Sequence, residues 1–214
     1  MKLWSCSVGA AALTLFLWVG AAAADVALPA PLTGGIGIFD ALKHRVSAGG
    51  SDFPTGEISL EELSSLLWAA TGINRTGMRK GWTVPMAMGR EPYCRVYVTG
   101  AKGTFFYDWN EHALREISQD DIRGKVGSQG FVGKAPYVLI FVTDGRALEE
   151  FDASRGPAWG QVAVGAMTQN VYLAAESLNI GVRYIASLKA DAVRPGLKLA
   201  DNDTPVCIMP IGKK

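Results

Sequence analysis

The chain has 214 residues, of which 49% are apolar and 19% are charged. This length fits one domain with a sizeable core, so the composition excludes a disordered protein. The 21 basic and 20 acidic residues give a net charge of +1, which excludes a strongly basic nucleic-acid binder. Three cysteines exclude a disulfide scaffold, and two histidines exclude a histidine-rich metal site.

Residues 1–24 have the features of a Sec signal peptide. Lys2 supplies a positive charge, residues 8–19 are almost all apolar or small, and the alanines at 22–24 fit a cleavage site. A retained membrane anchor is the alternative, although the apolar stretch is shorter than the ~20 residues of a spanning helix. We therefore expect a periplasmic or secreted protein, with no stable membrane span after cleavage. Cleavage removes Lys2 and no acid, which leaves 20 basic and 20 acidic residues.

Two cysteines, Cys94 and Cys207, remain after such a cleavage. An oxidising compartment permits them to form a disulfide. The other interpretation is two small buried hydrophobic residues, since both lie in strand-like runs. Nothing in the sequence shows that the two strands are neighbours.

The first half of the chain contains a lead-in and two predicted helices. Residues 25–35 hold two prolines and a glycine pair, which predict an extended lead-in to a domain over residues 36–214. A short helix is predicted over residues 36–45. Ser59 and Glu62 form a capping box, and the leucines that follow at helical spacing predict a helix up to Gly72. A loop rich in glycine and arginine follows.

The second half alternates strands and helices. The continuous apolar run at residues 137–142 is typical of a strand buried on both faces. The longest helical pattern, residues 157–178, is apolar on nearly all sides, which predicts a buried central helix. Ser118 predicts the cap of a short helix to Lys125. The other predicted elements are strands at 94–99, 104–109, 181–187 and 205–210, and a helix at 190–197. These elements predict one α+β domain, with a mixed central sheet flanked by helices and a long central helix.

The common catalytic motifs are absent from the sequence. It contains no Gly-x-Ser-x-Gly, no His-Glu-x-x-His and no Gly-x-Gly-x-x-Gly after a strand. The acid pairs Glu61-Glu62 and Asp120-Asp121 fall at predicted helix starts, where carboxylates favour the helix dipole. The sequence therefore names no catalytic residue and no metal ligand.

The order of several segments carries a family resemblance. The segments are SLEELSSLLWAATGINR at residues 59–75, TVPMA at 83–87, VYV at 96–98 and QNVYLAAESL at 169–178. Over residues 38–214 the chain resembles the nitroreductase family of FMN flavoproteins, and within it the branch of SagB-type, thiazoline/oxazoline-forming dehydrogenases. The resemblance implies an α+β homodimer with FMN at each of two subunit-interface sites. It also implies two-electron transfer through flavin N5, and a dimer interface that includes the helix from Pro157.

The family's first motif, Arg-Arg-Ser-x-Arg-x-Phe, contacts the flavin and its phosphate. Arg45 and Ser47 match its first arginine and its serine, if two extra residues precede Phe53. The two other arginines have no counterpart. Each charged hydrogen bond to phosphate contributes roughly 1.5–3 kcal/mol, so this departure weakens the expected binding.

The family's second motif, Pro-Ser-Ala followed by Asn-x-Gln, also departs here. Met86 replaces the serine, Ala87 is kept, and Gly89 replaces the asparagine. Met86 can pack on a flavin face or fill the space that an absent cofactor leaves. Arg90 can meet an anion or be an ordinary surface charge. Trp82, nearby, can stack on a ligand or belong to the core.

Later residues complete the implied site. The resemblance places backbone amides of Ile185 and Ala186 against the flavin ring, and such donors do not depend on the side chain. Lys213 matches a basic residue near the end of the family's sequences and is a candidate phosphate ligand. Because Lys213 and Lys214 end the chain, fraying is the alternative.

Three functions remain open from the sequence. The first is an exported FMN-dependent oxidoreductase, which acts on a small-molecule substrate and takes electrons from a quinol or a redox partner protein. The alternative is a flavin-free periplasmic binding or interaction protein on a nitroreductase-like scaffold. The third is a structural partner of a modifying complex, with residues 72–93 and 109–133 as contacts.

Overall fold

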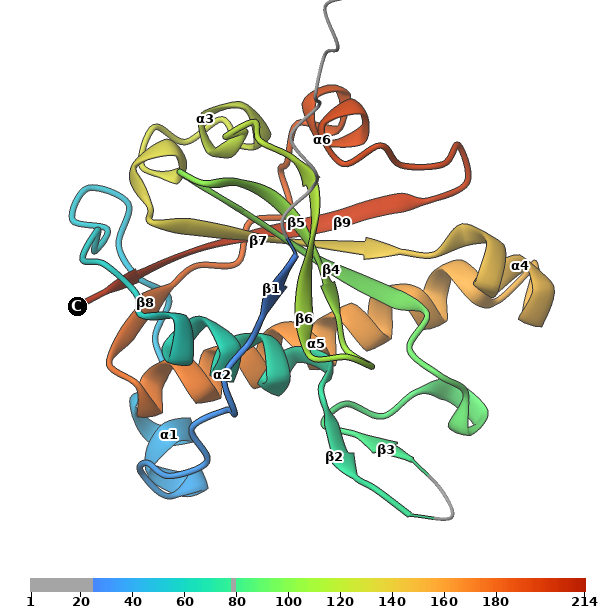
Figure 1. Ribbon diagram of the computed structural model, residues 1–214, viewed down its shortest axis with the longest axis horizontal. Coiled ribbons are helices and arrows are strands. Elements are labelled where there is room, and N and C mark those ends of the chain that lie inside the picture. The colour runs from blue at the N-terminus through green and yellow to red at the C-terminus, as the bar shows by residue number, and fades with distance from the viewer. Residues whose placement is uncertain (1–24, 78–79) are drawn as a thin grey trace, which may run out of the picture.

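A seven-stranded antiparallel sheet forms the centre of the molecule (Figure 1). The computed structural model describes residues 25–77 and 80–214, so the expected signal peptide lies outside the described residues. The strand order is β1-β6-β5-β4-β7-β9-β8. The strands are β1 (Val26–Ala27), β4 (Cys94–Gly100), β5 (Gly103–Asp108), β6 (Ala113–Ser118), β7 (Tyr137–Thr143), β8 (Ile180–Val182) and β9 (Thr204–Lys213).

Helices cover both faces of this sheet (Figure 1). On one face lie α2 (Leu60–Thr71) and α5 (Gly156–Ser177); on the other lie α3 (Arg123–Val126) and α6 (Ala190–Gly196). Strand β7 contributes Leu139 and Phe141 to the first core, and Val138, Ile140 and Val142 to the second. This alternation explains why its sequence is a continuous apolar run.

The predicted capping box sets the start of α2. The Ser59 hydroxyl accepts from the Glu62 amide at 3.2 Å, and the Glu62 carboxylate accepts from the Ser59 amide at 3.0 Å. The leucines at 63, 66 and 67 are then almost fully buried against α5 and the sheet. The capping box and the buried leucines therefore both support α2, and the predicted helix is confirmed.

The central helix α5 is confirmed as well, but it is not buried on all sides. Val164, Met167 and Val171 face the core and are at most 1% exposed. On the outer face, Val162 is 72% exposed. At Gly165, on the same face, an added Cβ would meet no atom within 4 Å. The outer face of α5 is thus open in the single subunit.

The structure corrects three expectations. The sheet is antiparallel at each pairing between its strands rather than mixed. Ser118 ends β6, and α3 starts only at Arg123 with no side-chain cap, because the Ser118 hydroxyl accepts instead from the Asp120 amide at 3.3 Å. The strand predicted at 181–187 stops at Val182, and Ile185 forms an isolated bridge to Ile208.

The remaining elements lie at the edges. The loop at 72–82 contains a small hairpin, β2 (Ile73–Arg75) and β3 (Gly81–Trp82). The lead-in pairs through β1 with β6. The other helices are α1 (Ile38–His44), η1 (Ala87–Gly89), η2 (Val132–Lys134) and α4 (Gly145–Asp152). In the part of the chain that the structure describes, no helix is long and apolar enough to cross a membrane.

Cys94 and Cys207 are both free and buried. Burial raises the pKa of the Cys94 thiol to about 12, and it raises the pKa of the Cys207 thiol as well. The two thiols are therefore unreactive core residues, in line with the second interpretation of the sequence.

Candidate functional site

The first group of site residues lies at the C-terminal end of α5. The guanidinium of Arg45 stands 5.1 Å from the centre of the Tyr172 ring, and the Ser47 hydroxyl is 2.8 Å from the Tyr172 hydroxyl. The Tyr184 amide donates to the same tyrosine oxygen at 2.8 Å. Tyr172 thus contacts both of the residues that the sequence predicted here, Arg45 and Ser47. Arg45 makes no ion pair within the described residues.

Lys213 lies in the last strand and does not fray. Its ammonium donates to the Glu62 carboxylate and, at 2.7 Å, to the Leu178 carbonyl, which ends α5. Burial raises the pKa of the Glu62 carboxyl, but hydrogen bonds from Lys213 and the Ser59 amide keep that pKa below its ordinary value. The charge of Lys213 is therefore already paired with the Glu62 carboxylate, which makes Lys213 less available to a phosphate.

The segment after β8 offers some of the expected amides. The Ile185 amide donates to the Ile208 carbonyl at 2.9 Å and is thereby committed to the sheet. Ala186 and Ser187 are exposed, and their amides donate no hydrogen bond to the described residues. Arg183 fixes the segment by donating to the Ala48 carbonyl at 2.9 Å. Of the predicted pair, only Ala186 has an amide free to meet a ligand.

The second group of site residues lies at the N-terminal end of α5. Met86 is 9% exposed, and the Ala87 amide donates to the Tyr93 hydroxyl at 3.1 Å. Gly89 has a φ of +66°, which favours glycine. The Arg90 guanidinium stands 4.2 Å from the Phe151 ring centre. A mainly apolar cleft of 240 Å³ lies between this loop and α5, lined by residues that include Met86, Trp159 and Val162.

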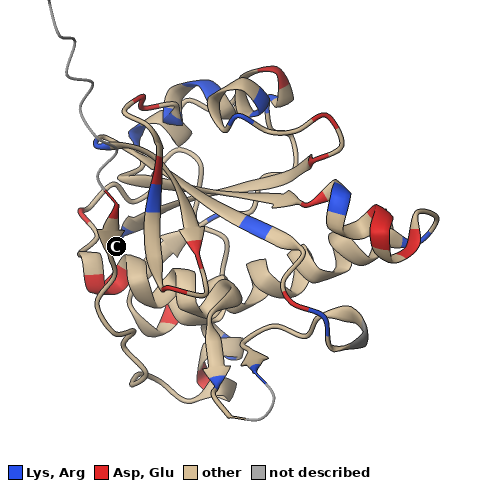
Figure 2. Cartoon of the chain, turned by 45° about the vertical axis from the view of Figure 1, so that its right-hand side comes forward, with Lys and Arg blue, Asp and Glu red and all other residues tan. Residues whose placement is uncertain are grey.

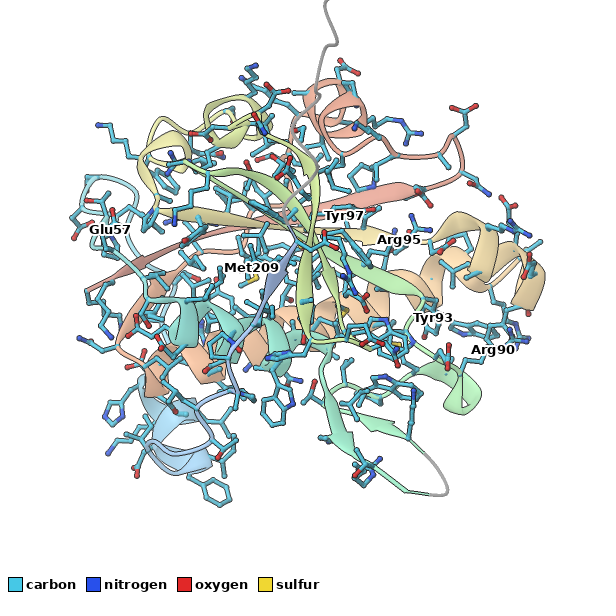
Figure 3. All side chains as sticks on the ribbon, viewed as in Figure 1. Glu57, Arg90, Tyr93, Arg95, Tyr97 and Met209 are labelled. Atoms are coloured by element: carbon cyan, nitrogen blue, oxygen red, sulfur yellow. The ribbon has the colours of Figure 1, made fainter. Side chains whose placement is uncertain are left out.

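The two groups are separate within one subunit. Tyr172 contacts the residues of the first group, and Ala163 lines the cleft of the second group. These residues are nine positions apart on α5, or about 13 Å at a rise of 1.5 Å per residue. Figure 3 shows Arg90 and Tyr93 near α4, whereas β8 lies at the far end of α5 in Figure 1. Within one subunit the predicted residues therefore lie in two groups, toward opposite ends of α5.

Tyr172, Arg183 and Tyr93 were missed as site residues by sequence reasoning. Tyr172 belongs to the quoted segment at 169–178, but helical periodicity marks it only as a core position. Its hydroxyl contacts Ser47, 125 residues earlier, which no local pattern reveals. Among the described residues, no group of three or more metal-ligating side chains is present.

Comparison with known proteins decides the family. The model of the nitroreductase family matches residues 52–213, which is most of the chain. The chain belongs to the nitroreductase family. This membership confirms the family-level resemblance and, at a general level, implies an FMN-dependent oxidoreductase.

Individual nitroreductase relatives agree. The chain is 28% identical over 172 residues to MJ1384 of Methanocaldococcus jannaschii, which carries a nitroreductase name, covering 76% of this chain and 85% of that one. A crystal structure from Ralstonia eutropha JMP134, titled as a nitroreductase, is 32% identical with a TM-score of 0.82 and 91% coverage of both chains. The Escherichia coli microcin synthetase McbBCD complex matches at 17% identity and a TM-score of 0.65, over 86% of this chain and 75% of that chain. That last likeness shows the fold alone.

The donor set of the first group fits FMN. A phosphate needs cationic and hydroxyl donors, which Arg45 and Ser47 supply. A flavin ring edge needs amide donors, and those of Ala186 and Ser187 are exposed and free of partners in the described structure. Lys213 is the exception, because Glu62 already neutralises its charge.

Proposed function

We propose that the protein is an FMN-dependent oxidoreductase whose cofactor sites lie between the two subunits of a homodimer. The separation of the two groups of site residues along α5 carries this proposal. In a two-fold dimer built on the outer face of α5, the loop at 85–91 of one subunit approaches the Arg45 group of its partner. A site that is divided in one subunit then becomes complete in the pair.

Exposed apolar residues support the dimer. Val162 on α5 is 72% exposed, and Phe39 on α1, which packs against α5, is 82% exposed. Val46, just after α1, is 58% exposed. Large apolar side chains exposed on α5, on α1 and just after α1 favour an interaction surface on this side of the subunit. A second copy of the chain is the occupant that would also complete the cofactor sites.

Each group of residues has a distinct role in this proposal. Arg45 and Ser47 bind the phosphate, the amides of Ala186 and Ser187 orient the ring, and the loop at Met86 covers its apolar face from the partner subunit. FMN, when bound, supplies two-electron transfer through N5. The protein binds the cofactor, orients it and excludes water from the transfer.

We further propose export and membership of the SagB-type branch. The features of residues 1–24 support export, and the segments at 59–75 and 169–178 support the branch. A protein that crosses the membrane unfolded acquires FMN afterwards. It then depends on a quinol or a redox partner protein, since nicotinamide dinucleotides are not expected there.

A complementation experiment tests the shared site. Arg45→Gln removes the phosphate cation, and Ala87→Glu places a charge on the loop. Homodimers of either variant should lose FMN, whereas a heterodimer purified through two different tags keeps one intact site and should hold about half of the parent's FMN per chain. Arg146→Gln, an exposed position on α4, is the control and should hold FMN like the parent. A heterodimer without FMN would contradict a site shared between subunits.

One observation favours the flavin-free alternative. The Lys213 ammonium is held by Glu62 and the Leu178 carbonyl, and the Ile185 amide is held by β9. Two of the predicted cofactor contacts are thus satisfied by the protein itself. If the purified dimer takes up no FMN from excess, the protein is a binding protein on this fold.

A further inference from the structure

A groove of 860 Å³ lies under the β2–β3 hairpin, next to the loop at 85–91. Among the residues that the structure describes, three basic residues line it, Arg75, Lys80 and Arg90, against one acidic residue, Glu91. Figure 2 shows basic positions on both sides of the grey break in this hairpin. The groove therefore carries an excess of positive charge in a chain whose overall charge is nearly balanced.

The two arginines of the groove have no carboxylate partner. Within the described residues, Arg95, Arg115, Arg123 and Arg146 each pair with an acid, but Arg75 and Arg90 form no ion pair. Lys80 donates to the neutral Asn110 side chain at 2.8 Å. The cationic groups that face the groove are thus free to meet an anion.

The Arg75 guanidinium lies against Gly81, and the Arg90 guanidinium lies against an aromatic ring. The Arg75 guanidinium lies so close to Gly81 that an added Cβ there would be 2.4 Å from Nη2, so the absence of a side chain at Gly81 makes room for it. The Phe151 ring holds Arg90 at 4.2 Å. Neither contact removes the charge, and a planar guanidinium suits a carboxylate.

Apolar side chains line one part of the groove, beside the polar Asn74 and Thr83. Val84 and Met86 are buried, and Trp82 is half-buried with its ring edge-on to Trp109 at 5.7 Å. The Trp82 Nε1 group is buried and has no hydrogen-bond partner in the part of the chain that the structure describes. A ligand with a flat apolar body and an acidic end matches the apolar part of this lining and the excess of positive charge.

We propose that this groove binds a small planar carboxylate, with Arg75 and Arg90 at its acidic end and Trp82 beside its apolar body. That this groove is the substrate subsite rests on the proposed function, because the loop at 85–91 would bring the groove beside the flavin. Binding itself needs neither flavin nor electron transfer. The two claims can therefore fail separately.

Calorimetry with redox-inert probes tests the proposal. The purified protein is titrated with 2-naphthoate, with 2-naphthamide as the neutral probe of the same shape, and with 2-naphthyl phosphate. We expect 2-naphthoate to bind about tenfold more tightly than the amide, the size of one charged hydrogen bond. Absence of 2-naphthoate binding, equal affinities for acid and amide, or tighter binding of the phosphate would overturn the assignment.

Variants locate the binding site. Arg75→Gln should weaken 2-naphthoate binding severalfold, Glu91→Gln should strengthen it, and Arg146→Gln should leave it unchanged. The opposite signs for Arg75 and Glu91 cannot arise from a loss of folding. A uniform response of the three variants would place the ligand elsewhere. Because Arg75 lies outside the proposed flavin contacts, the FMN content of Arg75→Gln should equal that of the parent.

Discussion

At the scale of single residues, a tyrosine hydroxyl and a histidine ring form hydrogen bonds between segments that lie far apart in the sequence. Tyr172 holds Ser47 and the Tyr184 amide, and His112 holds the lead-in. The His112 Nε2 lies 2.8 Å from the Ser64 hydroxyl and 3.0 Å from the Pro29 carbonyl, and its Nδ1 lies 2.9 Å from the Tyr107 hydroxyl. These contacts suit a neutral imidazole that donates from Nε2 and accepts at Nδ1.

His112 makes stability depend on pH. Burial lowers the pKa of His112, against a smaller opposite effect of the Pro29 carbonyl. Below about pH 6.5 the unfolded chain takes up the proton more readily than the folded one, so the free energy of unfolding falls as the pH drops through the folded pKa. Urea denaturation between pH 7.5 and 5 should show this loss, and His112→Asn should reduce the slope.

The other histidine provides the control for this experiment. His44 is exposed on α1, and its replacement by Asn should leave the slope of the parent protein unchanged. Asn tolerates the positive φ of 48° at position 112, so backbone strain does not obscure the result. A parent slope retained in His112→Asn would show that other groups cause the acid sensitivity.

Asp203 is a second residue with a large expected effect. It is 2% exposed, accepts from Arg95 at 2.8 Å, and accepts from the amides of Ala200 and Gly145 at 3.2 and 3.3 Å. Asp203→Ala leaves the buried Gly145 amide without a partner and Arg95 with Asp144 alone, and it should lower the free energy of unfolding by about 1–3 kcal/mol. Asp201→Ala, on the exposed turn beside it, should change it by less than about 0.5 kcal/mol. Equal losses in both variants would refute this account.

At the scale of elements, the capping box is the local signal that the structure satisfies most directly. Both of its hydrogen bonds are present, and α2 packs against α5. Ser59→Ala removes one partner of the Glu62 amide and should cost about 1 kcal/mol of stability, measured by thermal unfolding. Ser128→Ala, in a turn outside the helices and strands, is the control. No difference between the two would contradict the role of the cap.

Sequence patterns predicted the elements in which local and tertiary forces agree. The helices α2 and α5 and the strands β4, β5 and β7 have strong caps or clear apolar runs. Strand β6 and helix α4 were missed. Arg115 and Glu116 interrupt the apolar pattern of β6, and α4 begins at Asp144, which accepts from the Ala147 amide at 3.0 Å but precedes few apolar residues. Their positions depend on contacts with the rest of the molecule.

The candidate site was predictable only through family resemblance. Arg45 and Ser47 were found from a motif, and the structure brings both to Tyr172. No pattern showed that Glu62 would hold Lys213, because 151 residues separate them. Similarly, no sequence pattern showed that the Met86 loop lies at the other end of α5 from Arg45. Contacts between distant segments, and between subunits, have no local signal.

At the scale of the whole molecule, the proposed dimer and its shared cofactor sites depend on the outer face of α5. Val162 is 72% exposed, so its substitution does not disturb the core of a subunit. Val162→Asp should convert the proposed dimer into folded monomers and release FMN, because the proposed site needs residues of both subunits. Leu60→Asp, at a 40% exposed position on α2, should leave both properties unchanged. Light scattering reports the mass, and a monomer that keeps FMN would contradict the shared site.

The most direct test of the central claim is the visible spectrum of the purified protein after incubation with excess FMN and gel filtration, with the mass measured across the same peak. The account predicts a flavin band that stays with a dimer, at one FMN per subunit. A colourless, folded dimer would contradict the oxidoreductase and favour the flavin-free binding protein. A flavin band on a monomer would contradict the interface site.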